Sequence, residues 1–245
     1  MTKKARSAED DDLEDGLVAL SRLATGRMSL KDTLLRVAQF ASRAIPGANG
    51  VGLTLIEDGR ADTIVATEPF VTEMDAVQYG LKQGPCISAV AGEVPVISDS
   101  ISSDSRWPQF GPQSAGFGIE SSLSLPLITS DGVVGSLNVY AHEKKAFDDR
   151  AALLGGYFAV PAAIAVQNAQ ILAESKRLAL HLRTALNNRM IVERAVGVLM
   201  TRSGDSAEAA IARIRTISNS EHKKIDIVAQ DILDTAVRRA NARRA

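Results

Sequence analysis

The chain has 245 residues, of which 45% are hydrophobic and 23% charged, and its formal net charge is −1. This length allows one large domain or two small ones, and the composition is that of an ordinary globular protein. Cys86 is the only cysteine, which excludes an internal disulfide and a cysteine-rich zinc site. The N-terminal stretch is charged and lacks the apolar core of a signal peptide, and no apolar run reaches the ~18 residues of a membrane span. We therefore expect a cytoplasmic protein that does not enter a membrane.

The charge is distributed unevenly along the chain. From Ser175 to the end there are 14 Lys and Arg residues against 7 Asp and Glu residues, whereas the preceding part has 14 against 22. A basic C-terminal segment favours attraction to nucleic acid, because phosphate contacts from Lys and Arg supply most of the sequence-independent affinity. A solvated helical surface would explain the same charges equally well, so charge alone leaves both interpretations open.

The first fifty residues predict two helices. Residues 1–12 are predicted to be disordered, since their acidic run has no apolar face to bury. Leucines at helical spacing predict a helix that begins at Leu13 and ends near Gly26. A second helix is predicted from an N-cap at Ser29 to a stop at Pro46.

The pattern then changes to that of strands. The run GVGLTLIEDGRADTIVAT predicts two strands around an Asp58-Gly59 turn. A short strand is expected at residues 94–97, and SSLSLPLI and GVVGSLNVYA predict two more strands in a hairpin. We expect an antiparallel sheet of about five or six strands, with helices at both ends and one loop-rich side. This is the α+β architecture of a sensor domain.

Residues 148–202 predict one very long helix, or two helices nearly end to end. The predicted seam consists of residues at a seven-residue spacing: Ile164, Ile171, Leu178, Ala185, Val192 and Leu199. Such a row is typical of a coiled coil and indicates that two chains pair. The alternative is a break at Pro161 that leaves two unrelated amphipathic helices in phase.

Three motifs in the middle of the chain carry a family resemblance. The runs QYGLKQGPCISAV, DSRWPQF and SSLSLPLITSDGVVGSLNVYAHEKKAFDD resemble the GAF domains of actinobacterial GAF-ANTAR regulators, over roughly residues 30–165. The resemblance implies a domain that binds a small molecule, between the sheet and its loop-rich side, or that serves as a dimerising sensor. The candidate ligand-pocket residues are Tyr79, Pro85, Cys86 and Trp107.

Two of these residues have alternative interpretations. A thiol at a helix N-terminus, such as Cys86, can act as a redox sensor. Without a resolving cysteine, a small buried hydrophobic residue is the favoured interpretation. Trp107 lies in an Arg-Trp-Pro turn, which favours a lid or a core anchor over a direct ligand contact.

The C-terminal stretch carries a second resemblance. The run ALNNRMIVERAVGVLMTRSGDSAEAAIARIRTISNSEHKKIDIVAQDIL resembles the ANTAR module, over about residues 182–237. The resemblance implies a three-helix, RNA-binding domain that acts as a transcription antiterminator. The candidate RNA-binding residues are Ala185, Arg189, Arg194, Ala195, Gly197, Arg215, Lys223 and Lys224. Among them, the small residues Ala195 and Gly197 would let a base approach the backbone, and arginines would stack on bases or hold phosphate.

The helices of this module are also visible in the residues themselves. Gly204 is expected to end the first helix, and Asp205 or Ser206 to cap the second. The second helix should close near Asn219. A third helix is predicted from an apolar stripe made of Ile225, Val228, Ile232 and Val237.

The sequence therefore predicts an α+β chain with four segments. These are a disordered N-terminus (1–12), a GAF sensor domain with an antiparallel sheet flanked by helices (13–165), a coiled-coil linker helix (166–181) and an all-α, three-helix ANTAR domain (182–245). The sequence shows no phosphate loop, no metal-ligand pair at helical spacing and no nucleophile elbow. We expect no enzyme activity, no cofactor and no metal site.

Two functions remain open at this point. The first is a dimeric, signal-responsive transcription antitermination regulator, in which the GAF domain senses a small molecule or mediates dimerisation and the ANTAR domain binds hairpin loops in nascent transcripts. The alternative is a ligand-sensing dimeric signalling protein that acts through protein contacts without RNA. Salt dependence separates them, because RNA affinity falls steeply with salt and an apolar helix contact hardly changes.

Overall fold

The structure is a computed structural model that describes residues 8–23, 28–57 and 60–243. The chain divides into two compact units, Met1–Ala173 and Glu174–Ala245. The helices of the first unit are α1 (Ala8–Ser21), α2 (Leu30–Ala44), α3 (Pro69–Leu81), α4 (Pro85–Gly92) and α5 (Phe110–Ser114), with short 3₁₀ turns at Ile101–Ser103 and Ala115–Phe117. The strands are β1 (Gly50–Glu57), β2 (Arg60–Ala66), β3 (Val96–Ser98), β4 (Ser121–Thr129) and β5 (Gly132–Ala141). Helix α6 (Asp149–Ser203) begins in the first unit and ends in the second.

The five strands form one antiparallel sheet in the order β2-β1-β5-β4-β3. The expected antiparallel sheet is therefore confirmed, and the β4–β5 hairpin lies where the sequence predicted it. The Asp58-Gly59 turn lies outside the described residues. Strand β3 begins at Val96, two positions after the start of the predicted strand, because Pro95 has no N–H to contribute to a strand ladder.

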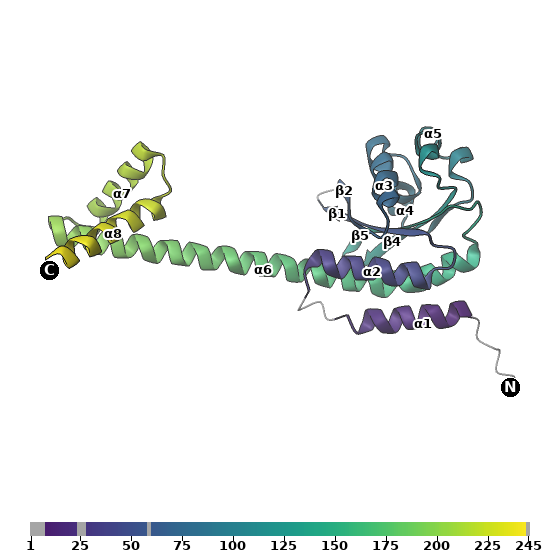
Figure 1. The fold of residues 1–245 in the computed structure, drawn as a ribbon, viewed down its shortest axis with the longest axis horizontal. Coiled ribbons are helices and arrows are strands. Elements are labelled where there is room, and N and C mark those ends of the chain that lie inside the picture. The colour runs from purple at the N-terminus through teal and green to yellow at the C-terminus, as the bar shows by residue number, and fades with distance from the viewer. Residues whose placement is uncertain (1–7, 24–27, 58–59, 244–245) are drawn as a thin grey trace. The chain divides into compact units, whose positions relative to one another are not determined.

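The two faces of the sheet differ in chemistry because side chains alternate along each strand. Leu53, Leu125 and Leu137 point to one face, where they join the core formed with α1, α2 and the start of α6. Figure 1 shows these helices on one side of the sheet and α3, α4 and α5 on the other. The second face carries small and polar side chains, and it is the face that holds the site described below.

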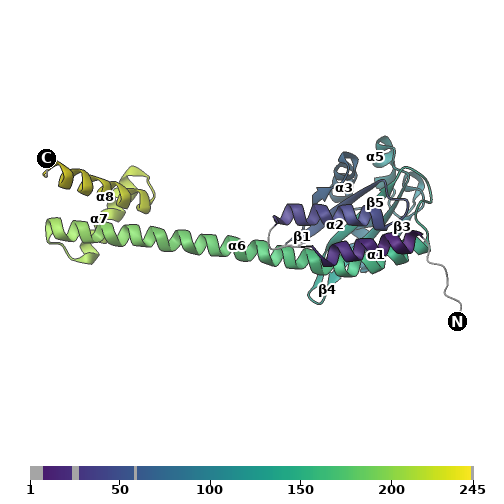
Figure 2. The ribbon, with the colours of Figure 1, turned by 60° about the horizontal axis from the view of Figure 1, so that its bottom comes forward.

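The N-terminal helix corrects one prediction. Helix α1 begins at Ala8, so the described part of the segment predicted to be disordered is helical. Acidic side chains such as Asp11 and Asp12 are favourable in the first turns of a helix, because they complement its positive end. Leu13 and Leu20 are buried and secure the helix to the core, and Figure 2 shows α1 lying along α2 and the first part of α6.

Helix α6 is a single helix of 55 residues that contains Pro161, so the expected long helix is confirmed and the alternative of a break at this proline is wrong. A proline inside a helix costs about 3 kcal/mol through a lost hydrogen bond and a steric clash. The neighbouring side chains Ala162, Ala163 and Val166 are fully buried in the core of the first unit, and this burial holds the helix together across the proline. The helix fits a coiled coil, as the sequence indicated.

The predicted seven-residue row does not stay on one surface. Ile164, Ile171 and Leu178 are 52–58% exposed, whereas Leu199, at the end of the same row, is 7% exposed in the core of the second unit. A straight α-helix drifts by about 20° per seven residues. Over five such steps the row turns by roughly 100°, so its last members face the chain's own helices instead of a seam.

The second unit consists of the last part of α6 with α7 (Ala207–Glu221) and α8 (Ile225–Ala242). Gly204, with φ of +70°, ends α6, and the Ser206 side chain accepts a hydrogen bond from Ala209 N at 3.3 Å, as an N-cap. Both terminal signals were predicted. The core of this unit contains Ala195, Val196, Leu199, Ala210, Ile214, Val228 and Ala229.

Val237 corrects the predicted stripe of α8. This side chain is 59% exposed, whereas Val228 is 3% exposed. At 100° per residue, Val237 lies on the opposite side of the helix from Val228. The stripe that begins at Ile225 therefore ends at Ile232 and Leu233, which pack against the core.

Candidate functional site

The sheet face below α3 and α4 is buried but polar. Strand β5 contributes Ser136, Asn138 and Tyr140, which are fully buried and alternate with the apolar Leu137 and Val139 on the other face. Thr54 on β1 and Ser122 and Ser124 on β4 extend the same polar face. Polar groups are expensive to bury unless they are hydrogen-bonded, so this face requires specific partners.

Asp75 of α3 is the centre of the hydrogen-bond network on this face. Its Oδ1 accepts hydrogen bonds from the Tyr140 hydroxyl at 2.5 Å, Asn138 Nδ2 at 3.0 Å and Gln78 Nε2 at 3.3 Å. The carboxyl group is fully buried. Burial, and then the negative charge of Asp75, raise the pKa of Tyr140 well above its usual value, so this phenol stays protonated and donates.

Helix α3 packs closely against strand β1 at Gly52, which brings Asp75 to the network. A side chain at Gly52 would lie 2.7 Å from Val71 and 2.8 Å from Asp75 Oδ2, so only glycine fits below this part of α3. The Tyr79 hydroxyl lies 2.5 Å from Thr54 Oγ1, and Thr54 Oγ1 in turn accepts from Asn138 Nδ2 at 3.2 Å. Two small residues of β1, Gly52 and Thr54, therefore determine how closely α3 packs on the sheet.

The Gly84-Pro85-Cys86 turn joins the same network. The backbone N–H of Cys86 donates to Gln78 Oε1 at 2.8 Å. Gly84 has φ of +144°, and a side chain there would lie 2.3 Å from Gln78 Oε1. The turn thus needs glycine both for its backbone conformation and for the approach of Gln78.

The Cys86 thiol is poorly suited to redox sensing. It is fully buried as a free cysteine. Burial, with a smaller contribution from the charge of Asp75, raises its pKa to about 12. Because the thiolate is the reactive form, the structure favours the interpretation of Cys86 as a small buried residue.

Two hydroxyls on this face are left without partners in the described part of the chain. The Oγ atoms of Ser122 and Ser124 are buried and form no hydrogen bond there. In the β4–β5 ladder, Ser122 pairs with Tyr140 and Ser124 with Asn138. The unsatisfied hydroxyls therefore adjoin the residues that hold Asp75.

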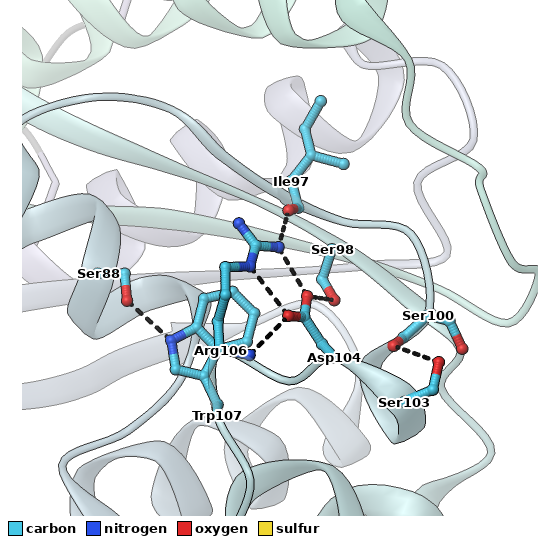
Figure 3. A network of polar contacts seen from close by, with 8 residues as sticks. All are labelled: Ser88, Ile97, Ser98, Ser100, Ser103, Asp104, Arg106 and Trp107. Atoms are coloured by element: carbon cyan, nitrogen blue, oxygen red, sulfur yellow. Dashed lines mark hydrogen bonds and ion pairs between the residues drawn. The ribbon is translucent and has the colours of Figure 1, made fainter.

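Trp107 takes part in another network of polar contacts, next to strand β3 (Figure 3). Its Nε1 donates to Ser88 Oγ of α4 at 2.8 Å, and its ring lies 4.3 Å from the Arg106 guanidinium. Arg106 donates to Asp104 and to the Ile97 carbonyl on β3. The side-chain hydrogen bond from Arg106 holds the pKa of Asp104 below its usual value. This arrangement supports the core-anchor interpretation of Trp107.

The four predicted pocket residues make different contacts. Tyr79 and Cys86 contact the polar network, Pro85 is buried at the start of α4, and Trp107 anchors a loop. The sequence prediction missed Asp75, Gln78 and Asn138. The alternation of polar and apolar residues in β4 and β5 contained a signal for the polar face, because an ordinary buried strand is apolar on both faces.

Arg189 and Arg194 lie on different sides of α6. Arg189 and Arg194 are both exposed on α6, but five residues separate them, which places them roughly 140° apart around the helix. Arg189 Nε lies 2.7 Å from Glu193 Oε1, and this bond raises the pKa of Arg189. Arg194 forms no ion pair with the residues that the structure describes.

The two small residues of the predicted RNA surface differ in exposure. Ala195 is fully buried in the core, so its side chain is not open to a base in this structure. Along α6, residues that face the core recur at the same helical spacing as residues that face solvent. The sequence pattern therefore did not distinguish the two. Gly197 is exposed, and a Cβ added there would have no atom within 4 Å. Ala185 is also exposed, on a turn of α6 before the helix reaches the core of the second unit.

The remaining candidates lie on α7 and at the start of α8. Arg215 is exposed on α7, and Lys224 is the N-cap of α8. Neither forms an ion pair within the described chain. Lys223 Nζ, in contrast, lies 2.8 Å from Glu221 and 3.9 Å from Asp231. The cations available to an anionic partner therefore include Arg194, Arg215 and Lys224.

Family models match both parts of the chain. A GAF domain matches residues 27–167, and an ANTAR domain matches residues 180–233. The chain belongs to the GAF-ANTAR family. The polar sheet face therefore lies in the GAF domain, and the free cations lie in the ANTAR domain. Among curated protein sequences, none matches the chain.

Solved structures are similar to the GAF domain. The GAF domain of an Acinetobacter phosphoenolpyruvate-protein phosphotransferase is 15% identical, with 69% of this chain and 99% of that chain covered and a TM-score of 0.53. A type II free methionine-R-sulfoxide reductase from Thermoplasma acidophilum is 18% identical, with 57% and 93% covered and a TM-score of 0.48. The free methionine-R-sulfoxide reductase of Neisseria meningitidis is 15% identical, with 72% and 98% covered and a TM-score of 0.49. At such identities, the likeness to the Acinetobacter domain shows the fold alone.

The two domains define a regulator with a sensory domain and an RNA-binding output domain. In the described part of the chain, α6 is the one helix that is long and apolar enough to cross a membrane. However, 44% of its most apolar 18-residue stretch is buried inside the protein. Phe158, Ala162 and Val166 of this helix lie in the GAF core. The apolar character of α6 is thus that of a core helix in a typically soluble domain.

Proposed function

We propose that the protein is a cytoplasmic transcription antitermination regulator whose ANTAR domain binds hairpin loops in nascent transcripts under control of the GAF domain. The observation that carries this proposal is the ANTAR match at residues 180–233 together with free cations on the helices of that domain. Binding of the hairpin would stabilise one RNA structure at the expense of a terminator hairpin. The protein acts as a homodimer and not as an enzyme.

The charge of the output domain supports an anionic partner. The part of the chain from Ser175 onward has an excess of seven positive charges, whereas the part before it has an excess of eight negative charges. Such a partition draws RNA to one domain and repels it from the other. Arg194, Arg215 and Lys224 supply the contacts, because their charges are not neutralised by carboxylates of the described chain.

The polar face of the sheet supports a sensory role for the GAF domain. Asp75 holds donors from α3 and β5, and Ser122 and Ser124 present unsatisfied hydroxyls beside them. A small polar molecule that satisfied these hydroxyls would bind against the sheet and shift α3. Tyr79, through Thr54, and Cys86, through Gln78, belong to the same hydrogen-bond network, which supports them as residues of the proposed pocket.

The alternative is a dimeric signalling protein that acts through protein contacts without RNA. The exposed apolar residues of α6, among them Ile171 and Leu178, favour this function as far as the helix is concerned. Salt dependence separates the two functions, because counterion release makes RNA affinity fall steeply with salt. An apolar contact between helices changes little over the same range.

The test is a binding titration with hairpin RNA between about 50 and 200 mM salt. We expect an affinity that falls by at least tenfold and that exceeds the affinity for an unpaired RNA of the same composition. A transcription assay on a template with a terminator, with and without the protein, measures readthrough. Affinity that does not depend on salt or on the hairpin would contradict the proposal.

A further inference from the structure

The side chain of Gln78 fills the centre of the polar sheet face. It belongs to α3, is fully buried, and contacts both β5 and the first turn of α4. Its Nε2 donates to the Tyr140 hydroxyl at 2.7 Å and to Asp75 Oδ1 at 3.3 Å, and its Oε1 accepts from the Cys86 N–H at 2.8 Å. The donors and the acceptor of this carboxamide are therefore all used inside the domain.

The three partners of Gln78 define a specific recognition pattern. The Tyr140 hydroxyl gives its own proton to Asp75, so its oxygen accepts from the group at this position. Asp75 also accepts, whereas Cys86 presents a backbone donor at the start of α4. A neutral carboxamide matches all three, because it has two donors and an acceptor in one plane. A carboxylate has no donor and is repelled by Asp75, and an amidinium group has no acceptor for Cys86.

The walls around Gln78 fit a planar group closely and leave polar atoms over. A Cβ at Gly84 would lie 2.3 Å from Gln78 Oε1, so the turn before α4 packs directly on the carboxamide. On β4, the hydroxyls of Ser122 and Ser124 are fully buried and have no hydrogen-bond partner among the residues that the structure describes. Ser122 lies next to Tyr140 in the ladder. Since a buried polar atom without a partner costs stability, Gln78 satisfies this face only in part.

We propose that the GAF domain recognises a ligand through a neutral carboxamide, at the position that Gln78 fills in this structure. The inference rests on the proposed sensory role of the polar face and names the chemistry of its ligand. Gln78 acts as an intramolecular competitor. A ligand with the same group takes over the hydrogen bonds to Tyr140, Asp75 and Cys86, and its further polar atoms satisfy the hydroxyls of β4.

Displacement of Gln78 changes the connection between α3 and α4. In this structure its side chain joins α3 to the first turn of α4, and its backbone carbonyl accepts from Gln83 N at 3.2 Å in the turn that ends α3. Once a ligand contacts Cys86 instead, α3 keeps its bond between Asp75 and Tyr140 but loses the side-chain contact with α4. The ligand therefore acts on the α3–α4 turn.

Replacing Gln78 by alanine in the full-length protein tests the recognition pattern. The substitution removes Cγ, Cδ, Oε1 and Nε2, which correspond atom for atom to acetamide. Acetamide should therefore bind the Gln78→Ala protein and raise its melting temperature by about 2–4 °C, once its concentration exceeds the dissociation constant several-fold. Acetate and acetamidinium have the same shape but lack the donors or the acceptor, so neither should do this at matched ionic strength. If Gln78→Ala does not fold alone, acetamide should restore folding and acetate should not.

Gln83→Ala is the matched control variant. Gln83 is half-buried and its Oε1 accepts from Gln109 N at 3.3 Å, so the same atoms are removed away from the polar face. This variant should not respond to acetamide. The wild-type protein should need at least about tenfold more acetamide than Gln78→Ala, because its own carboxamide is tethered at the site. Equal responses of the three proteins, or equal effects of acetamide and acetate on Gln78→Ala, would overturn the proposal.

The wild-type protein tests displacement of Gln78 by larger carboxamides. Trp107 is the only tryptophan, and its Nε1 donates to Ser88 Oγ of α4, so its fluorescence reports on that helix. Propionamide, benzamide and nicotinamide are compared with propionate, benzoate and nicotinate. We expect a change with at least one amide and none with its acid. No change with any amide, or equal changes with the acids, would contradict displacement.

Hairpin affinity is measured separately on each protein. Loss of hairpin binding by the wild-type protein would contradict the proposed antitermination function and leave the carboxamide site in place. Wild-type hairpin affinity, with no preference of Gln78→Ala for acetamide over acetate, would overturn the carboxamide site alone.

Discussion

Tyr140 on β5 donates a hydrogen bond at 2.5 Å to Asp75 on α3, which is 65 residues away in the chain. Both residues are fully buried. The bond ties the helix over the polar face to the middle of the sheet, so the position of α3 depends on the state of this face. A ligand that competes for Asp75 would act on α3 directly.

Replacing Tyr140 by Phe tests this bond. The substitution leaves the buried Asp75 with one donor fewer, and we expect a loss of about 1–3 kcal/mol in the free energy of unfolding. Urea denaturation followed by circular dichroism measures the loss. Tyr157→Phe is the control, because Tyr157 is 58% exposed and has no hydrogen bond with the described residues. Equal stability of the two variants would contradict a structural role for the Asp75 network.

The Cys86 thiol should resist modification in the folded protein. Its pKa of about 12, against an ordinary value of 9.0, leaves little thiolate at pH 8, and because the thiol is buried, reagents reach it only when the domain opens. Because the folded protein holds this proton more tightly than the unfolded chain, stability is full below about pH 9 and falls as pH rises from 9 towards 12. Thiol labelling at pH 8, with and without urea, measures the effect. Rapid labelling of the folded protein would restore the redox-sensor interpretation.

The sequence predicted the elements whose position depends on local chemistry. The hairpin of β4 and β5, the N-caps Ser29 and Ser206 and the stop at Gly204 rely on local chemistry, and the structure has each of them. Which members of the seven-residue row are exposed and which are buried could not be predicted in the same way. Whether an apolar residue of α6 faces solvent or α7 depends on tertiary packing, as Ala195 shows.

The polar face was missed for a similar reason. The pocket prediction came from motifs in loops and therefore selected Trp107, whereas the network is centred on Asp75 and Asn138. These two residues are 63 positions apart in the chain and meet only because α3 lies across β5. Only the alternation of polar and apolar residues along the strands pointed to this face.

Substituting Gly197 by alanine distinguishes an effect on the stability of the ANTAR domain from an effect on RNA binding. A Cβ at this position meets no atom within 4 Å, and alanine is favoured over glycine inside a helix by roughly 0.5–1 kcal/mol. Gly197→Ala should therefore raise the melting temperature of the ANTAR domain. If a base approaches the backbone there, hairpin affinity falls in the same variant. Unchanged affinity with raised stability would remove Gly197 from the RNA surface.

Ala195 provides the opposite case on the same helix. Because this side chain is fully buried between α6, α7 and α8, Ala195→Leu overpacks the core and should destabilise the domain by about 1–3 kcal/mol. Thermal unfolding measures the loss. Any decrease in RNA affinity should then follow the unfolded fraction. A weakened RNA complex in a variant of wild-type stability would return Ala195 to the binding surface.

The most direct measurement is the hairpin affinity of Arg215→Ala and Lys224→Ala, with Lys223→Ala as a comparison. Arg215 and Lys224 are exposed and unpaired within the described chain, whereas Lys223 contacts Glu221 and Asp231. We expect roughly tenfold weaker binding for Arg215→Ala and Lys224→Ala, with a shallower salt dependence where the residue holds phosphate. Lys223→Ala should change affinity less, because its charge is already neutralised. Wild-type affinity and salt dependence in both Arg215→Ala and Lys224→Ala, at unchanged melting temperature, would contradict the proposed RNA surface.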